Sequence, residues 1–200
     1  MCKVSISKGN TKMGEIASVS LPPIITCVMC DCHFKCYADR MFKRWKNVKA
    51  AYERNWDVLN NDPDTYWREV ESAIMMSRFF RFHVSGDIPN KEYFANMVDV
   101  AARNPHCEIL CFTKKYDIVN LFVKTCGQMP ENLHMVFSGW PGLEMKNEFS
   151  FPEAHVRFKK SESYIPENAK ECGGNCFDCA TTNEGCWTLK KGESVVFNEH

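Results

Sequence analysis

The fold is decided by residues 79–138, which read FFRFHVSGDIPNKEYFANMVDVAARNPHCEILCFTKKYDIVNLFVKTCGQMPENLHMVFS. Three short apolar runs alternate there with two longer segments whose apolar residues recur at helical spacing. This pattern predicts strands at 79–85, 107–113 and 133–138, separated by helices at 91–104 and 116–126. Alternation of strands and helices with short connections is typical of a parallel sheet. We therefore expect an α/β fold built on a mostly parallel sheet.

The flanking segments extend this core. Apolar spacing predicts helices at 37–60 and 65–78 and a further strand at 154–159. Residues 1–26 are expected to be extended and loop-like, because glycines and two consecutive prolines interrupt them. The chain has 200 residues, whereas a complete eight-unit barrel takes about 250 residues. We therefore expect the sheet to form a partial (β/α) barrel.

The composition excludes several classes of protein. The 25 basic and 25 acidic residues give a net charge of zero, and 44% of the residues are hydrophobic, which is enough for a packed core. No apolar run reaches the roughly 18 residues of a membrane-spanning helix. Residues 1–8 also lack the apolar region of a signal peptide. We therefore expect a cytoplasmic protein with no membrane partner.

The net charge does not indicate a nucleic-acid partner, because nucleic-acid-binding domains usually carry a basic excess. One segment keeps that interpretation open. Between Met41 and Trp56, basic residues stand among aromatic ones, namely Lys43, Arg44, Lys46, Lys49 and Arg54. A solvated helix face is the competing interpretation, and salt-dependent binding to single strands would distinguish the two. The oligomeric state is not predicted.

The twelve cysteines are unevenly distributed. One group, spaced C-x2-C-x-C-x3-C, is Cys27, Cys30, Cys32 and Cys36, and another, spaced C-x3-C-x2-C-x6-C, is Cys172, Cys176, Cys179 and Cys186. Converging thiolates hold zinc or iron–sulfur clusters, whereas disulfides rarely persist in the cytosol. The compact first spacing favours an iron–sulfur cluster over zinc, because it lacks the paired C-x2-C halves of a zinc ribbon. We expect one or two metal sites, with the groups separate or merged.

These groups also suggest a division of the chain. Residues 1–169 would form the partial barrel together with a cysteine-rich N-terminal loop. Residues 170–200 would form a cysteine-rich, metal-binding cap that ends in a short tail.

Polar side chains gather at the predicted carboxyl ends of the strands, where α/β proteins place their active sites. Alternation along the first strand puts Arg81, His83 and Ser85 on one face. Gly86 follows, where the backbone could approach a ligand closely. The candidate catalytic residues are His83, Ser85, Asp87 and Lys114, and the candidate cofactor-binding residues are Arg81, Ser85, Gly86, Thr113 and Ser138.

The chain resembles a known family at positions spread over nearly its whole length. The matching motifs are Gly9-Asn10-x-Lys12-x-Gly14, Ser20-Leu21-Pro22-Pro23, Thr26-Cys27, Cys36-Tyr37-Ala38, Arg81-x-His83-x-Ser85-Gly86-Asp87, Thr113-Lys114, Pro130-Glu131-Asn132-Leu133, Cys176-x2-Cys179 and Cys186-Trp187. They are similar to those of an uncharacterised family carried by bacteriophages and bacteria and labelled gene-product-88-like. The family has no assigned reaction. The resemblance therefore implies a fold and a site map, and a location in the host cytoplasm if the chain is phage-encoded.

A weaker resemblance is to radical S-adenosylmethionine enzymes. In these enzymes a C-x3-C-x2-C loop, often followed by Tyr-Ala, binds a 4Fe-4S cluster ahead of a partial α/β barrel. Cys32-x3-Cys36-Tyr37-Ala38 is similar, and Ser85-Gly86-Asp87 stands where a glycine-rich strand end contacts the cofactor. The third cysteine of the loop would fall at Asp39, which departs from the pattern. This resemblance implies S-adenosylmethionine as a further cofactor.

These observations support three hypotheses. The first is an iron–sulfur enzyme acting on an unknown small or macromolecular substrate, with the strand-end residues lining a pocket between the cysteine groups. The second is a zinc-stabilised protein that binds a host macromolecule, in which zinc contributes folding energy alone. The third is a redox or thiol-transfer protein that uses Cys107, Cys111 or Cys126, which we otherwise expect to be structural.

Overall fold

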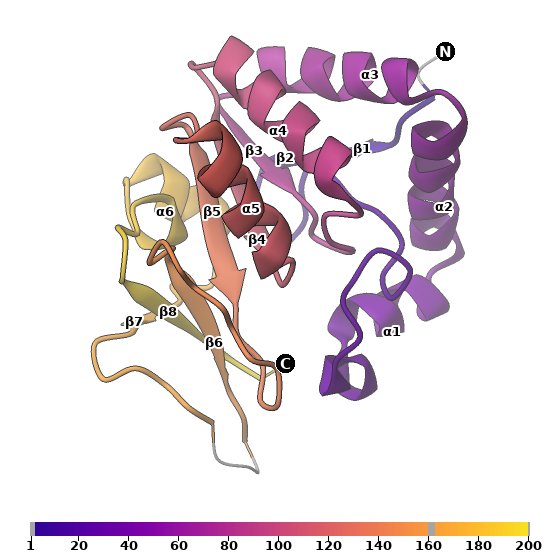
Figure 1. Ribbon diagram of the computed structural model, residues 1–200. Coiled ribbons are helices and arrows are strands. Elements are labelled where there is room, and N and C mark those ends of the chain that lie inside the picture. Colours follow the sequence, from indigo (N-terminus) through magenta and orange to yellow (C-terminus); the bar gives the residue numbers. More distant parts are fainter. Residues whose placement is uncertain (1–2, 160–162, 200) are drawn as a thin grey trace.

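The computed structural model describes residues 3–159 and 163–199 (Figure 1). In that part of the chain, eight strands form one sheet in the order β1-β2-β3-β4-β5-β6-β8-β7. The strands are β1 (Ile6–Ser7), β2 (Ala17–Val19), β3 (Phe79–Phe82), β4 (Glu108–Thr113), β5 (Leu133–Ser138), β6 (Glu153–Arg157), β7 (Lys170–Glu171) and β8 (Ser194–Asn198). Every neighbouring pair is parallel except β1 with β2. The expected α/β fold with a mostly parallel sheet is confirmed, and the sheet is open, with β1 and β7 at its edges.

The described ranges also contain six α-helices and two short 3-10 helices. The α-helices are α1 (Tyr37–Arg44), α2 (Lys46–Asn61), α3 (Pro63–Met75), α4 (Lys91–Arg103), α5 (Tyr116–Cys126) and α6 (Cys176–Thr181). The 3-10 helices are η1 (Asp31–Lys35) and η2 (Gly185–Trp187). None of these helices has the length and apolar character needed to cross a bilayer.

The central elements follow the predicted pattern closely. Helix α5 and strand β5 occupy their predicted ranges, and α4 begins where Asn90 caps it by accepting a hydrogen bond from the Tyr93 amide (2.8 Å). Strand β3 is shorter than predicted. It ends at Phe82, and the next residue, His83, has a φ of +58°. This left-handed conformation stops the alternation of side chains along the strand.

The flanking segments differ from their prediction in three places. The helix expected at 37–60 is two helices, because the backbone is extended at Trp45 (φ −110°, ψ 107°). Two short strands, β1 and β2, occur where a loop was expected. The predicted tail is β8, which pairs with both β6 and β7. The segment from Lys170 to Asn198 therefore adds two strands to the same sheet.

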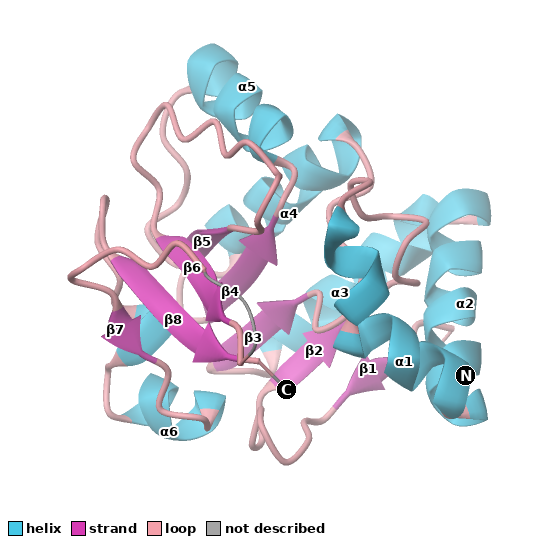
Figure 2. Ribbon diagram, turned by 90° about the horizontal axis from the view of Figure 1, so that it is seen from below, coloured by secondary structure: helices cyan, strands magenta, loops and turns pink. Residues whose placement is uncertain are grey.

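The sheet is covered differently on its two faces. Figure 2 shows α3, α4 and α5 on one side and α6 on the other. Phe80 and Phe82 belong to the buried core on the side of α3, α4 and α5. On the opposite side, Phe79 packs against Trp187 of η2, with ring centres 5.4 Å apart, and Ala180 of α6 joins the same cluster. The C-terminal cysteine segment therefore covers the face opposite α3, α4 and α5.

Candidate functional site

The carboxyl ends of β3 and β4 are tied together by a buried carboxylate. Asp87 accepts hydrogen bonds from Thr113 Oγ1 (2.6 Å), the Lys114 amide (2.9 Å) and the Ile88 amide (2.8 Å). Burial raises the pKa of Asp87, and these hydrogen bonds oppose the shift. A carboxylate offers about four acceptor positions, so three donors use most of its capacity. The structure brings Asp87 and Thr113 together as predicted, but their polar atoms are used within the protein.

Gly86 does not open a path to a ligand. Its φ is +82°, and a Cβ atom built on it would lie 2.8 Å from both Leu21 O and Thr26 Oγ1. Leu21 donates its amide to Ser85 O (3.0 Å), and Thr26 Oγ1 accepts from the Asp87 amide (3.0 Å). The expectation that Gly86 lets a cofactor approach is wrong, because the segment after β2 fills that space. Close backbone packing requires glycine at this position.

His83 lies on the opposite side of the sheet from Arg81. Its Nε2 is 3.0 Å from Tyr93 Oη of α4, and its Nδ1 is 3.9 Å from Cys111 Sγ of β4. Burial, and then the charge of Arg81, lower the pKa of His83 to about 3, so the imidazole is neutral at physiological pH. The prediction that His83 shares a face with Arg81 is wrong, because the positive φ turns the side chain towards the helices.

Arg81 points into the face that the C-terminal cysteines cover. Its Nη1 lies 3.2 Å from Met13 Sδ and 3.8 Å from Cys176 Sγ, and its guanidinium stands 4.8 Å from the Phe112 ring centre. Within residues 3–159 and 163–199, no carboxylate pairs with it. Its buried Nε and the buried Ser85 Oγ both lack a hydrogen-bond partner among the described residues. Because buried polar atoms are nearly always paired, these two atoms single out the end of β3 as the candidate site.

The second cysteine group surrounds α6. Asn175 caps this helix by accepting hydrogen bonds from two backbone amides, and Cys176 and Cys179 lie one turn apart on it. The sulfur of Cys179 lies between two glycines. A Cβ atom on Gly173 would stand 3.4 Å from that sulfur, and one on Gly185 would stand 3.2 Å from it. The loops on both sides of α6 therefore close around Cys179.

The four sulfur atoms of this group influence one another. Burial, and then the neighbouring thiolates of Cys172 and Cys176, raise the pKa of Cys186 to about 12. Burial and the same two thiolates also raise the pKa of Cys179. The structure thus brings the four cysteines within electrostatic range, and a bound cation would reverse the repulsion. Among the residues that the structure describes, no three or more His, Cys, Asp or Glu side chains have the arrangement of a formed metal site.

The first cysteine group is arranged differently. A disulfide joins Cys30 to Cys32, contrary to the expectation of four free thiols. Cys36 is the N-cap of α1. Cys27 lies within electrostatic range of Asp87. Burial and then the Asp87 charge raise the pKa of Cys27, and Cys36 adds to the shift. As described, this group contributes two free thiols.

Lys114 and Ser138 lie on the same rim of the sheet. The charge of Lys114 opposes the rise in the pKa of Cys27, and its Nζ stands 5.9 Å from the Trp140 ring centre. The Ser138 carbonyl accepts a hydrogen bond from Tyr116 Oη of α5. Lys114 therefore connects the predicted strand-end site to the first cysteine group, whereas the Ser138 backbone is tied to α5.

Tyr37, which the sequence reasoning did not choose as a site residue, lies between the two cysteine groups. Its side chain is 45% exposed, but its hydroxyl donates to Val84 O at the end of β3 (2.7 Å). Burial at this hydroxyl end raises the pKa of Tyr37; Arg81 opposes the shift, and Cys36 and Cys176 add to it. One phenol is therefore within electrostatic range of both groups. The Cys-Tyr-Ala motif was the sequence signal that could have identified it.

Two of the remaining cysteines have the surroundings expected of structural residues. Cys107 and Cys111 are buried, and burial raises the pKa of both, that of Cys107 to about 12. Cys126 is exposed at the end of α5. Cys2 lies outside the described residues.

The fold and the site define an α/β protein with an open, mostly parallel sheet, a polar carboxyl edge and a cysteine group on one face. The chain belongs to the Gene product 88 family, whose model matches residues 4–184. This match confirms the family resemblance seen in the sequence. No curated protein and no solved structure matches the chain.

Proposed function

We propose that the chain binds an iron–sulfur cluster through Cys172, Cys176, Cys179 and Cys186, and that it is an enzyme whose substrate meets the polar end of β3. Arg81 carries this proposal. It is a partly buried cation with no carboxylate partner in the described ranges, and its Nη1 reaches the sulfur of Cys176 (3.8 Å). Buried charges are normally paired. Thiolates around a metal would supply the missing negative charge.

The electrostatics of the sulfur atoms supports the same conclusion. Two of these thiols, those of Cys179 and Cys186, resist ionisation, because burial and the neighbouring cysteines raise their pKa values. A metal displaces the thiol protons and turns mutual repulsion into attraction. When bound through all four cysteines, such a cluster supplies electron transfer. Arg81 would donate to a ligand sulfur, and donors of this kind tune a cluster's reduction potential.

A second centre at Cys27, Cys30, Cys32 and Cys36 is part of the proposal but requires a reduction first. Opening the disulfide between Cys30 and Cys32 takes two electrons and two protons, which a small dithiol supplies as it closes to its own disulfide. A reducing cytoplasm keeps such thiols available. The loop follows β2 at the carboxyl edge of the sheet, beside Lys114. A centre there would face the same polar rim.

The arrangement of the sheet supports a partial barrel. The strands from β2 to β8 run parallel, and α3, α4 and α5 cover one face (Figure 2). S-adenosylmethionine is not included in the proposal. Leu21 and Thr26 fill the space before Gly86. Asp39, which stands in the place of a third loop cysteine, pairs with Lys43 (2.6 Å).

Anaerobic reconstitution of the reduced full chain with iron and sulfide tests the proposal. We expect visible absorption typical of iron–sulfur clusters, with iron and acid-labile sulfide retained after desalting. Cys176→Ser combined with Cys179→Ser should lose the C-terminal cluster, whereas Cys126→Ser, at an exposed cysteine elsewhere, should retain the full content. A colourless wild-type protein without iron would refute the proposal.

A zinc-stabilised protein that binds a host macromolecule is the second candidate. The observation in its favour is the enclosure of Cys179 by Gly173 and Gly185, because closed sites are typical of structural zinc. Zinc would then contribute folding free energy. This candidate predicts stoichiometric zinc after purification, a lower Tm after chelation, and partner binding that is unchanged in Arg81→Gln. Zinc retention without iron uptake would decide in its favour.

A further inference from the structure

A ridge of half-exposed rings and cations runs along α1. We define the α1 ridge as Tyr37, Arg40, Met41, Arg44 and Trp45. Tyr37, Met41 and Trp45 are 45%, 44% and 46% exposed, so each is held on one side and open on the other. Tyr37, Met41 and Arg44 share one face of the helix because they are spaced by four and three residues. The proposed metal site does not use this ridge as a binding surface.

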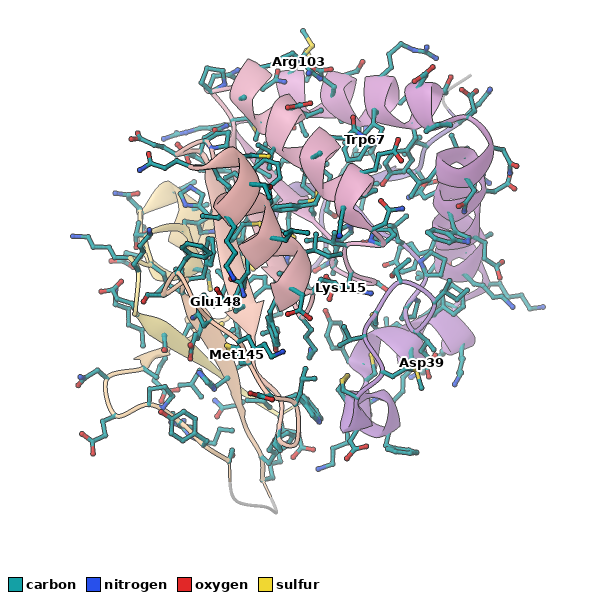
Figure 3. All side chains as sticks on the ribbon, in the orientation of Figure 1. Asp39, Trp67, Arg103, Lys115, Met145 and Glu148 are labelled. Carbon is teal, nitrogen blue, oxygen red and sulfur yellow. A yellow bond between two sulfur atoms is a disulfide. The ribbon has the colours of Figure 1, made fainter. Side chains whose placement is uncertain are left out.

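The ridge lies in a basic part of a neutral chain. Residues 34–49 contain six of the 25 basic residues and one of the 25 acidic ones, which leaves 19 basic against 24 acidic elsewhere. Three of the six cations are paired, Lys35 with Glu199, Lys43 with Asp39 (labelled on α1 in Figure 3) and Lys49 with Glu53. Arg40, Arg44 and Lys46 form no ion pair with any described residue. The surface therefore presents three uncompensated cations.

Cations and rings are already in contact on this surface. The Arg44 guanidinium stands 5.3 Å from the Trp45 ring centre, and Lys49 Nζ stands 5.9 Å from that of Phe42. Phe42 is stacked on Tyr52, with ring centres 6.3 Å apart. Rings alternating with cations are the means by which proteins bind single-stranded nucleic acid without sequence preference. Bases stack on the rings, and the cations follow the phosphates.

We propose that the α1 ridge binds single-stranded nucleic acid, with bases stacked on Tyr37 and Trp45 and phosphates paired with Arg40, Arg44 and Lys46. This inference goes beyond the proposed function and does not rest on it. A hollow of about 210 Å³ adjoins the start of α2, which follows the ridge directly. It is lined by Asn47, Tyr52 and the serines Ser5, Ser7, Ser18 and Ser20 among others. Hydroxyl and amide groups there suit the sugar–phosphate chain.

An anionic membrane surface is the other partner that cations and aromatic rings could serve. A helix that lies in a membrane presents a continuous apolar face. Arg44 falls on the same face of α1 as Tyr37 and Met41, so membrane insertion would bury its charge among acyl chains. A nucleic acid places a phosphate at this position instead. The spacing of the ridge therefore favours nucleic acid.

Fluorescence anisotropy with a labelled, mixed-sequence DNA strand of about 20 nucleotides, long enough for sites of this kind, tests the proposal on the full chain. We expect binding that weakens steeply as salt is added. Trp45→Ala should weaken it roughly tenfold, because stacking on one ring has about that value, and Trp45→Phe should restore most of the loss. Arg40→Gln combined with Arg44→Gln should weaken it further and reduce the log–log salt slope by about 1.4, two phosphates' worth.

The matched control is Lys190→Gln combined with Lys191→Gln, which removes two exposed charges from the turn before β8. It should bind as the wild type does, and far-ultraviolet circular dichroism should show all variants folded. An absence of binding at low salt, an equal loss in the control, or full binding by the folded ridge variants would overturn the proposal. So would capture by phosphatidylserine vesicles that excess oligonucleotide does not reverse.

Discussion

Replacing His83 with asparagine should make the free energy of unfolding depend less on pH below pH 6.5. His83 is buried, and its pKa falls from 6.5 to about 3 in the folded state. Between these values the unfolded chain binds a proton that the folded chain does not, so stability falls as pH decreases below 6.5. The loss is about 1.4 kcal/mol per pH unit. At pH 4.5 it amounts to about 2.7 kcal/mol relative to neutral pH.

Urea unfolding at pH 7.5 and pH 4.5 measures this loss. Asparagine tolerates the positive φ at position 83 and does not titrate, so the variant should lose about 2.7 kcal/mol less than the wild type over this range. Tyr93 of α4 and Cys111 of β4 face His83, and the charge of Arg81 in β3 acts on it from the other side of the sheet; all three remain in the variant. His106→Asn, which removes an exposed imidazole, controls for the substitution. Equal pH dependence in the wild type and His83→Asn would refute the reasoning.

Three further substitutions test the packing of the strand ends by urea unfolding. Gly86→Ala should lower the free energy of unfolding by about 3 kcal/mol, because it combines a positive φ with overpacking. Gly127→Ala, at φ +89° with open space around it, should lower it by about 1 kcal/mol. Equal losses would contradict the packing role of Gly86. Asp87→Asn should lower the free energy of unfolding by about 2–4 kcal/mol, since an amide group replaces one of two buried acceptors. A loss as small as that of the exposed Asp57→Asn would show that the Asp87 hydrogen bonds do not stabilise the fold. Asn132→Ala should cost about 2–4 kcal/mol, because Nδ2 of this residue donates to the carbonyls of Ala101, Asn104 and Cys107; a loss below about 0.5 kcal/mol, the size of most surface effects, would show that these bonds contribute little.

The central elements could be predicted because their signals are local. Helices α4 and α5 repeat apolar residues over three turns, and Asn90 provides a cap that is visible in the sequence. Strands β1 and β2 contain two and three residues, which is too few to show an alternation of apolar and polar residues in the sequence. They exist because neighbouring chain segments offer backbone partners. The extended backbone at Trp45 likewise has no glycine or proline beside it that would have indicated a break in the helix.

The site could be located from the sequence but not oriented. The rule that α/β sites gather at strand ends selected Asp87 and Thr113 as candidates, and the structure places them in hydrogen-bond contact. The direction of His83 depends on one positive φ, which a strand pattern does not reveal. The filling of the space at Gly86 depends on Leu21 and Thr26, which come 65 and 60 residues earlier in the chain. Contacts between such distant segments are outside what local patterns report.

The position of β8 between β6 and β7 sets the order in which this edge of the molecule can be assembled during synthesis. Residues 194–198 leave the ribosome after both of their neighbours, so β6 has no partner on that side until they emerge. A nascent chain halted before Ser194 would display an unpaired strand edge, which is a template for aggregation. The segment that carries the second cysteine group would then be held by its packing on Phe79 but not by β8. Under the proposed function, metal would therefore bind at that segment after β8 has been translated.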